Sequence, residues 1–361
     1  MVDNQRAHRT KAGFTFQDLA AIILFIDNFD ELKSIKAEGN HEDIDIELLD
    51  GSWIYAQAKM ISDPINSNKN YRKRKMSESF TSLCNNLFNS KNPVSSIVYI
   101  SNCKDPLGEE DTATKSFYPV YPLTFDQLAK VTQNRVEKML GKKIENDYLK
   151  KKNKSKEEVL EILKKDFGVQ IIPFDPRHSY EDKFHSVQSY VGNFLINRNL
   201  MQNASLNIMR NWHDLFRENS ENYSKDKVLT KKDLLWVIVV IECNQPFNTD
   251  TIAFKLNVDV AIMDEISIRF KEVFDYISER LEFCATIWSD EEEYVKNHPN
   301  VSTSYIYDFI NNSWRNYLDF WDIDDITGEE QEVLIKMVLY RILTKKSTIK
   351  HIMETGNVNV D

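Results

Sequence analysis

The pattern of hydrophobic and polar positions predicts one buried helix and then an antiparallel hairpin near the start of the chain. From Phe14 to Phe29 the apolar residues have helical spacing, and the middle of this segment is almost wholly apolar, which favours a helix buried on most sides. Three short segments with strand character follow, at 32–38, 43–48 and 53–60. Asp50-Gly51 between the last two is a strong signal for a tight turn, so we expect these two strands to pair.

Further along, the pattern alternates between helix and strand and then becomes almost entirely helical. Residues 77–90 have helical spacing with Ser77 as N-cap, and 95–102 have an apolar centre that suits a strand buried on both faces. Ser155 and Glu158 have the spacing of a capping box, which predicts a helix ending near Gly168 and then a strand at 169–174. The later helices are predicted near 180–217, 229–243, 260–289, 301–321 and 328–354.

These elements predict two domains, as does the length of 361 residues. The first is an α+β domain at 1–178, with a core at about 12–102 and a more polar, basic insertion at about 103–168. The second is a mostly α-helical domain at 179–361, which we expect to mediate assembly with partners.

Charge and cysteine usage narrow the possible functions. The chain carries 46 basic and 56 acidic residues, a net charge of −10, which excludes a uniformly basic nucleic-acid-binding surface. Basic residues nevertheless outnumber acids by ten to three in 130–156, whereas twelve acids face two bases in 281–330. The four cysteines have no zinc-finger spacing. The polar N-terminus and the short apolar runs predict a reduced, soluble, cytoplasmic protein without a membrane segment.

The candidate chemistry lies in the hairpin. Alternate residues of a strand share a face, so Asp43, Asp45 and Glu47 should point one way. On the next strand Tyr55, Gln57 and Lys59 should also share a face. Folding at the turn can bring both polar faces to one side of the sheet, with Glu38 at its edge.

Such a mixture of carboxylates, an amide oxygen and a lysine is what phosphodiester hydrolysis needs. Carboxylates hold Mg²⁺ or Mn²⁺, which polarises the phosphate and lowers the pKa of the attacking water. A lysine beside the metal orients the nucleophile or stabilises charge on the phosphate oxygens. Acids that alternate along a strand are also common on a merely solvated sheet face, and the convergent Gln57 and Lys59 favour the catalytic interpretation.

Three motifs resemble those of a known nuclease family. The QxK pattern is similar to the variant form of the PD-(D/E)xK superfamily, and GFTFQ (13–17), EGNHEDIDI (38–46) and YAQAK (55–59) together resemble the Cap-four type endonuclease domain of the anti-phage systems CBASS and Lamassu. The resemblance implies a restriction-endonuclease-like core and metal-dependent cleavage of double-stranded DNA. The implied catalytic residues are Gln17, Glu38, Asp43, Gln57 and Lys59. The implied metal ligands are Glu38, Asp43 and Gln57, with Asp45 as the alternative aspartate.

The C-terminal half bears on which system the chain resembles. CBASS members carry a mixed α/β nucleotide-sensing domain there, whereas this half is helical in pattern. The whole chain is therefore more similar to the nuclease subunit of Lamassu. That resemblance implies an SMC-like ATPase and a small third subunit as partners. Cutting both strands of a duplex needs two sites facing opposite backbones, which predicts a homo-oligomer, dimer or tetramer, in the active state.

Other interpretations remain open at this point. The basic run Arg72-Lys73-Arg74-Lys75 is either solvated surface or a contact with DNA phosphates, and its place beside the hairpin favours DNA. The whole chain could instead be a non-catalytic adaptor that keeps a nuclease fold, or an Mrr-like restriction endonuclease.

Overall fold

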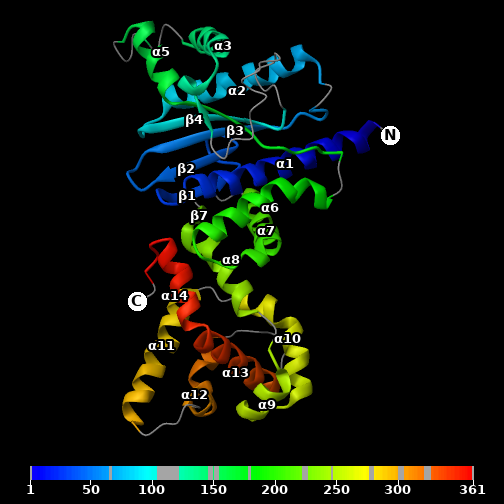
Figure 1. Cartoon of the computed structure of the whole chain (residues 1–361), viewed down its shortest axis with the longest axis vertical. Helices are drawn as coiled ribbons and strands as arrows, with labels where there is room; N and C mark the ends of the chain where they lie inside the picture. Colours follow the sequence, from blue (N-terminus) through cyan, green and yellow to red (C-terminus); the bar gives the residue numbers. More distant parts are fainter. Residues whose placement is uncertain are drawn as a thin grey trace. The chain divides into compact units, whose positions relative to one another are not determined.

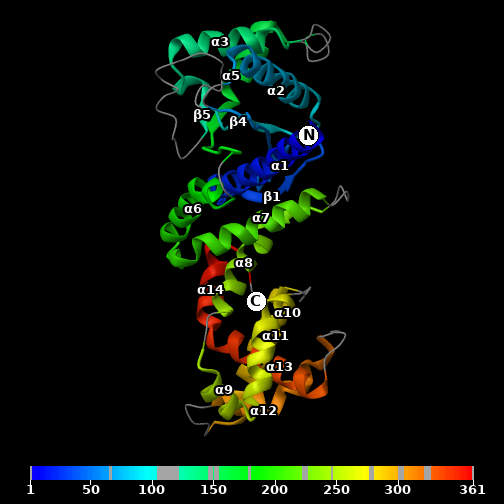
Figure 2. The same cartoon turned by 90° about the vertical axis from the view of Figure 1, so that its right-hand side faces the viewer.

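The chain forms two compact units, residues 1–231 and 232–361, in the computed structural model shown in Figures 1 and 2. The structure describes residues 2–64, 67–103, 122–144, 149, 154–177, 180–221, 227–244, 247–275, 280–299, 305–320 and 327–359. Unit 1 contains a mixed sheet between helices, and unit 2 is helical. The α+β class and the helical character of the C-terminal part are therefore confirmed.

A seven-stranded sheet with the order β5-β6-β4-β3-β2-β1-β7 forms the centre of unit 1. The strands are β1 (Leu32–Ala37), β2 (Ile44–Leu48), β3 (Trp53–Lys59), β4 (Val94–Ser101), β5 (Leu123–Thr124), β6 (Phe167–Ile171) and β7 (Leu229–Thr230). Neighbours pair antiparallel except at β3–β4 and β4–β6, which are parallel. The central strand β4 is buried from Ile97 to Ser101, as its apolar centre predicts.

The predicted hairpin is present, and its turn fixes which residues of β2 and β3 lie opposite each other. Gly51 has a φ of +80°, a conformation that a residue without Cβ adopts at little cost. The Asp50 carboxylate accepts hydrogen bonds from the backbone and the hydroxyl of Ser52. Ile44 consequently lies opposite Ala56, and Asp45 opposite Tyr55.

Helices cover both faces of the sheet (Figure 1). The helix α1 (Val2–Asp27) packs on β1 and β3, and α7 (Ser205–Glu221) also packs on β1. On the other face, α2 (Lys69–Asn89) packs on β3 and β4. Next to α2 are α3 (Lys130–Gly141) and α5 (Lys156–Lys165), and their apolar side chains share a core with Tyr55, Phe80 and Tyr99. The expected insertion thus extends this second face.

Unit 1 continues well past the domain boundary expected after residue 178. The helices α6 (Tyr180–Asn197) and α7 pack on α1. Trp212 of α7 is fully buried, and its ring centroid lies 5.2 Å from that of Phe25 in α1. These aromatic contacts make α6 and α7 part of the sheet-containing unit, so the units divide after Lys231.

Unit 2 is built around one helix that is buried on most sides, α13 (Gly328–Thr344). Its neighbours are α8 (Lys231–Cys243), α9 (Thr249–Leu256), α10 (Val260–Asp275), α11 (Arg280–Asn297), α12 (Tyr305–Ser313) and α14 (Lys346–Thr355). Two buried cations of α13 bond to carbonyls at helix ends: Lys336 donates to Leu256 O at 2.9 Å and Arg341 to Cys243 O at 2.6 Å. These bonds satisfy terminal carbonyl groups that lack partners within their own helices.

Several predicted boundaries were wrong. The helix predicted at 77–90 begins at Lys69 with Asn68 as N-cap, because Asn68 accepts a hydrogen bond from the Asn70 N–H and Ser77 lies within the helix. The strand predicted at 169–174 begins at Phe167, since the capping box at Ser155 starts a helix of only ten residues. The stretch predicted as helical near 180–217 contains two helices, α6 and α7.

Among the described helices, none is long and apolar enough to cross a membrane.

Candidate active site

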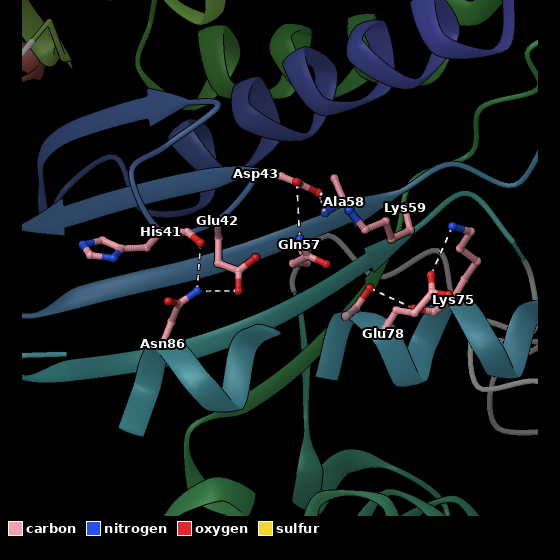
Figure 3. A network of polar contacts seen from close by, with 10 residues as sticks. His41, Glu42, Asp43, Gln57, Ala58, Lys59, Lys75, Glu78 and Asn86 are labelled. Atoms are coloured by element: carbon pink, nitrogen blue, oxygen red, sulfur yellow. Dashed lines mark hydrogen bonds and ion pairs between the residues drawn. The ribbon is translucent and has the colours of Figure 1, made fainter. Parts of the chain in front are cut away.

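The first group of expected site residues meets where β3 ends. Because Ile44 pairs with Ala56, residue 43 lies beside Gln57 and Ala58. Asp43 accepts a hydrogen bond from the Ala58 N–H at 3.0 Å. Lys59 Nζ lies 3.0 Å from Asp43 Oδ2, and Gln57 Nε2 lies 3.3 Å from Asp43 Oδ1. Figure 3 shows these three side chains converging. Because 27 % of the Lys59 side chain and 13 % of that of Asp43 are exposed, the group is open to a ligand.

Glu38 and Gln17 complete this arrangement from two other elements. Glu38 follows β1 with a φ of +49°, a left-handed conformation that is uncommon outside glycine. Its backbone N–H donates to the Asp43 carbonyl at 2.8 Å, and Gln17 of α1 hydrogen-bonds its carboxylate. Burial raises the pKa of Glu38 above its ordinary value and the nearby Asp43 charge raises it further, whereas Lys59 and Gln17 lower it. The two carboxylates therefore lie close enough to repel each other.

Asp45, the alternative aspartate, has another environment. Its carboxylate accepts hydrogen bonds from the backbone N–H groups of His41 and Glu42, both at 3.0 Å, and it is buried. A Cβ atom on Gly39 would lie 2.3 Å from Asp45 Cγ, so only glycine fits against this carboxylate. Asp45 thus holds the loop 38–43 in shape. In the described part of the chain, no hydrogen bond joins Asp45 to Gln57 or Lys59.

Glu42 is a residue of the site that the sequence interpretation missed. Its side chain is directed away from Asp43 toward α2 (Figure 3), where Asn86 Nδ2 donates to Glu42 Oε1 at 2.7 Å and to the His41 carbonyl at 2.8 Å. Burial raises the pKa of Glu42 to about 7, an effect moderated by Ser82, Asn86 and Gln57 and increased by the Asp43 charge. Strand alternation gave no signal for Glu42, because residues 38–43 form a loop.

The expected DNA-binding residues, Arg72 to Lys75, lie in the first turns of α2. The guanidinium of Arg72 donates to the Ser67 carbonyl at 2.9 Å, whereas 63 % of the Arg74 side chain and 30 % of that of Lys75 are exposed. Arg74 and Lys75 both pair with Glu78, at 3.7 Å and 3.1 Å. Figure 3 shows Lys75 and Glu78 on the side of the sheet where Lys59 lies.

The basic belt at 130–156 lies partly outside the described residues, namely at 145–148 and 150–153. Near its described part, Lys164 of α5 pairs with Glu137 and Glu161. Local acids therefore compensate some of the positive charge on this face of unit 1.

The chemistry of the donor set fits a magnesium ion. Glu38 and Asp43 provide carboxylates, and Gln57, whose amide nitrogen faces Asp43, provides an oxygen ligand once its amide turns over. Mg²⁺ is commonly bound by one or two carboxylates while water and phosphate complete its shell. Cations also relieve the mutual repulsion of two neighbouring carboxylates. Within the described residues, no set of three or more histidine, cysteine or acidic side chains has the geometry of a metal centre.

Comparison with known proteins gives only distant structural similarity. No protein family and no curated protein matches the sequence. The chain is similar to the Cap4 SAVED/CARF-domain containing receptor of Acinetobacter baumannii at 14% identity and a TM-score of 0.35, over 63% of this chain and 46% of the receptor. The corresponding receptor of Moraxella osloensis gives 14% identity, a TM-score of 0.34 and the same coverage. The chain thus spans less than half the length of these receptors.

Proposed function

We propose that the chain is a metal-dependent DNA endonuclease and serves as an effector of anti-phage defence. The observation that carries the proposal is the convergence of Asp43, Gln57 and Lys59. A lysine, an amide and a carboxylate that meet at an open strand end, beside a second carboxylate, are more typical of a catalytic site than of a purely structural contact. The motif resemblance supports the same activity. An adaptor that had lost catalysis would have no need of Lys59.

Within this proposal each residue has a role in chemistry at a phosphodiester. Glu38 and Asp43 would hold the ion with the amide oxygen of Gln57, and a bound Mg²⁺ would polarise the phosphate and lower the pKa of the attacking water. Lys59 would place its positive charge where negative charge develops on the phosphate oxygens. Gln17 would orient Glu38 through the hydrogen bond between their side chains.

The substrate and partners follow from the charges and from the resemblance. The exposed Arg74 and Lys75 would contact phosphates of double-stranded DNA beside the reacting bond. Unit 2 would carry the contacts with an SMC-like ATPase and a small third subunit. Cutting both strands requires two sites facing opposite backbones, and a symmetric dimer or tetramer supplies them.

Plasmid cleavage in Mg²⁺ or Mn²⁺ tests the proposal, with wild type compared with Lys59→Ala. We expect the variant to lose at least about 10²-fold in cleavage rate, because it lacks the charge that stabilises the transition state. Lys33→Ala is the matched control, since Lys33 forms an ion pair with Glu47 in the same three-stranded segment at 2.8 Å and lies outside the cluster. Cleavage by Lys59→Ala at the wild-type rate, or in excess chelator, would refute the assignment.

A further inference from the structure

A residue far along the chain holds the backbone immediately before Glu38. The Ala37 N–H donates to Asn219 Oδ1 of α7 at 3.2 Å, and Asn219 Nδ2 donates to the Lys227 carbonyl at 2.9 Å. Asn219 is 1% exposed. The oxygen and the nitrogen of its side-chain amide therefore both form their hydrogen bonds away from water. The side chain therefore joins the end of β1 to the segment that leads into β7.

We propose that Asn219 is a positioning residue for Glu38, an inference that rests on the proposed nuclease function. Glu38 adopts a left-handed conformation with a φ of +49°, which a residue with a side chain keeps only where its surroundings impose it. Asn219 holds the N–H of Ala37, one residue before Glu38, and the Asp43 carbonyl holds the N–H of Glu38 itself. Without Asn219, one of these two restraints is lost and the carboxylate is free to leave the position facing Asp43.

The helix that carries Asn219 has its own fixed place beside α1. His213 Nε2 of α7 lies 3.6 Å from Asp18 Oδ2, and both side chains are buried. Asp18 directly follows Gln17, the hydrogen-bond partner of Glu38. Since α7 contacts both α1 and β1, it fixes the two elements that together place the Glu38 carboxylate.

The test compares Asn219→Leu with Gln170→Leu in the full chain. Gln170 is a matched control because its amide is equally buried and bonds Asp27 at 3.1 Å, on β6, four strands away from β1. Hydrogen–deuterium exchange of the Ala37 amide should be about tenfold faster in Asn219→Leu, since the lost bond protected it, and unchanged in Gln170→Leu. Asn219→Asp retains an oxygen that accepts from the Ala37 N–H, so exchange of the Ala37 amide should stay slow. This variant also provides a test if the leucine variant does not fold.

Two further readings separate this inference from the nuclease proposal. The rise in melting temperature produced by Mn²⁺ should shrink in Asn219→Leu and persist in the control. Plasmid cleavage should fall by about 10²-fold through the rate constant, because a small displacement of a catalytic group is costly. The inference would be overturned if exchange of the Ala37 amide were unchanged in Asn219→Leu. It would also be overturned if the two leucine variants lost equal amounts of cleavage activity and of the Mn²⁺-dependent rise in melting temperature. A wild type that never cleaves DNA would refute the nuclease while the exchange comparison still decides the role of Asn219.

Discussion

Burial sets the protonation of several acids in unit 1. The pKa values of Asp18, Asp27 and Glu42 are each raised to about 7, and loss of hydration is the largest cause in every case. Asp27 gives the simplest example, because it is the last residue of α1 and stands apart from the candidate site. A negative charge is unfavourable at a helix C-terminus. Near neutral pH the folded chain therefore retains protons that the unfolded chain has released.

Asp27→Asn should stabilise the protein at high pH. Between the ordinary value of 3.8 and about 7, the folded carboxyl binds more protons than the unfolded one, so wild-type stability falls as pH rises through this window. The asparagine variant keeps an acceptor for Gln170 and lacks this loss. At pH 8 its free energy of unfolding should exceed that of wild type by up to about 4 kcal/mol, and near pH 4 the two should be similar. Urea denaturation at both pH values measures this.

Glu31→Gln is the control for this prediction, since Glu31 is an exposed acid four residues further along. Its substitution should leave the difference between the two pH values as in wild type. An Asp27→Asn variant whose stability follows the wild-type pH curve would contradict the explanation by burial.

Side chains on regular strands could be placed from sequence, and those on loops could not. Alternation put Gln57 and Lys59 on one face because β3 is a regular strand. It could not separate Asp43 from Asp45, since Asp43 precedes β2 and the loop before it sets its direction. Asn219 gave no local signal, because its partner Ala37 is 182 positions away. Only the folded chain reveals such a contact.

At the scale of elements, α2 combines a packing role with a charged end. Its later turns bury Phe80 and Leu83 under the sheet, while its first turns present Arg74 and Lys75. Glu78, one turn further along, pairs with both cations. Exposed pairs of this kind are weak, so a phosphate can replace the carboxylate.

Binding of a DNA duplex should therefore respond in opposite directions to two changes in α2. Arg74→Gln should weaken binding and reduce the slope of log affinity against log salt by about 1. Glu78→Gln should strengthen binding several-fold, because it removes a negative charge that competes with phosphate. Fluorescence anisotropy over a series of salt concentrations measures both, in chelator so that no cleavage occurs.

Lys232→Gln is the control for these changes, because Lys232 is a cation of unit 2 that pairs with Glu282. It should leave both the affinity and the slope unchanged. Equal effects of Arg74→Gln and Lys232→Gln would show that only net charge matters and that α2 is not the contact.

Element type was predicted well where local signals were strong. The hairpin followed from Asp50-Gly51, and the start of α5 followed from the capping box at Ser155, which the structure contains. The helical stretch predicted near 180–217 is confirmed as helical, but the break between α6 and α7 within it was not predicted. That segment contains no proline and one glycine within α6, so its pattern gave little reason to end a helix.

At the scale of the whole molecule, the division after Lys231 decides which fragment can fold. A chain ending at Arg177 lacks α6 and α7, and thus Trp212 and Phe194, whose rings pack on Phe25 of α1 and on Phe29 in the turn after it. Each buried aromatic side chain that is lost removes about 2 kcal/mol of stabilising free energy. The total free energy of unfolding of a domain is about 5–15 kcal/mol.

We expect fragment 1–231 to unfold cooperatively and fragment 1–177 to show no cooperative transition. Thermal denaturation followed by circular dichroism measures this, with the full chain as reference. The fragment ending at Lys231 keeps the bond from Lys231 Nζ to the Asp30 carbonyl at 2.9 Å. A cooperative transition in 1–177 at the midpoint of 1–231 would contradict the observed unit boundary.

The pairing of β1 with β7 also has a consequence during synthesis of the chain. Ser34 lies opposite Thr230, so the sheet closes only after the ribosome has translated residues 35–230. At about 5–20 residues per second, Asn219 follows Glu38 by roughly ten to forty seconds. Throughout this interval the nascent chain carries Asp43, Gln57 and Lys59 while the backbone before Glu38 has no brace from α7. The proposed active site is therefore completed only after α7 has been translated.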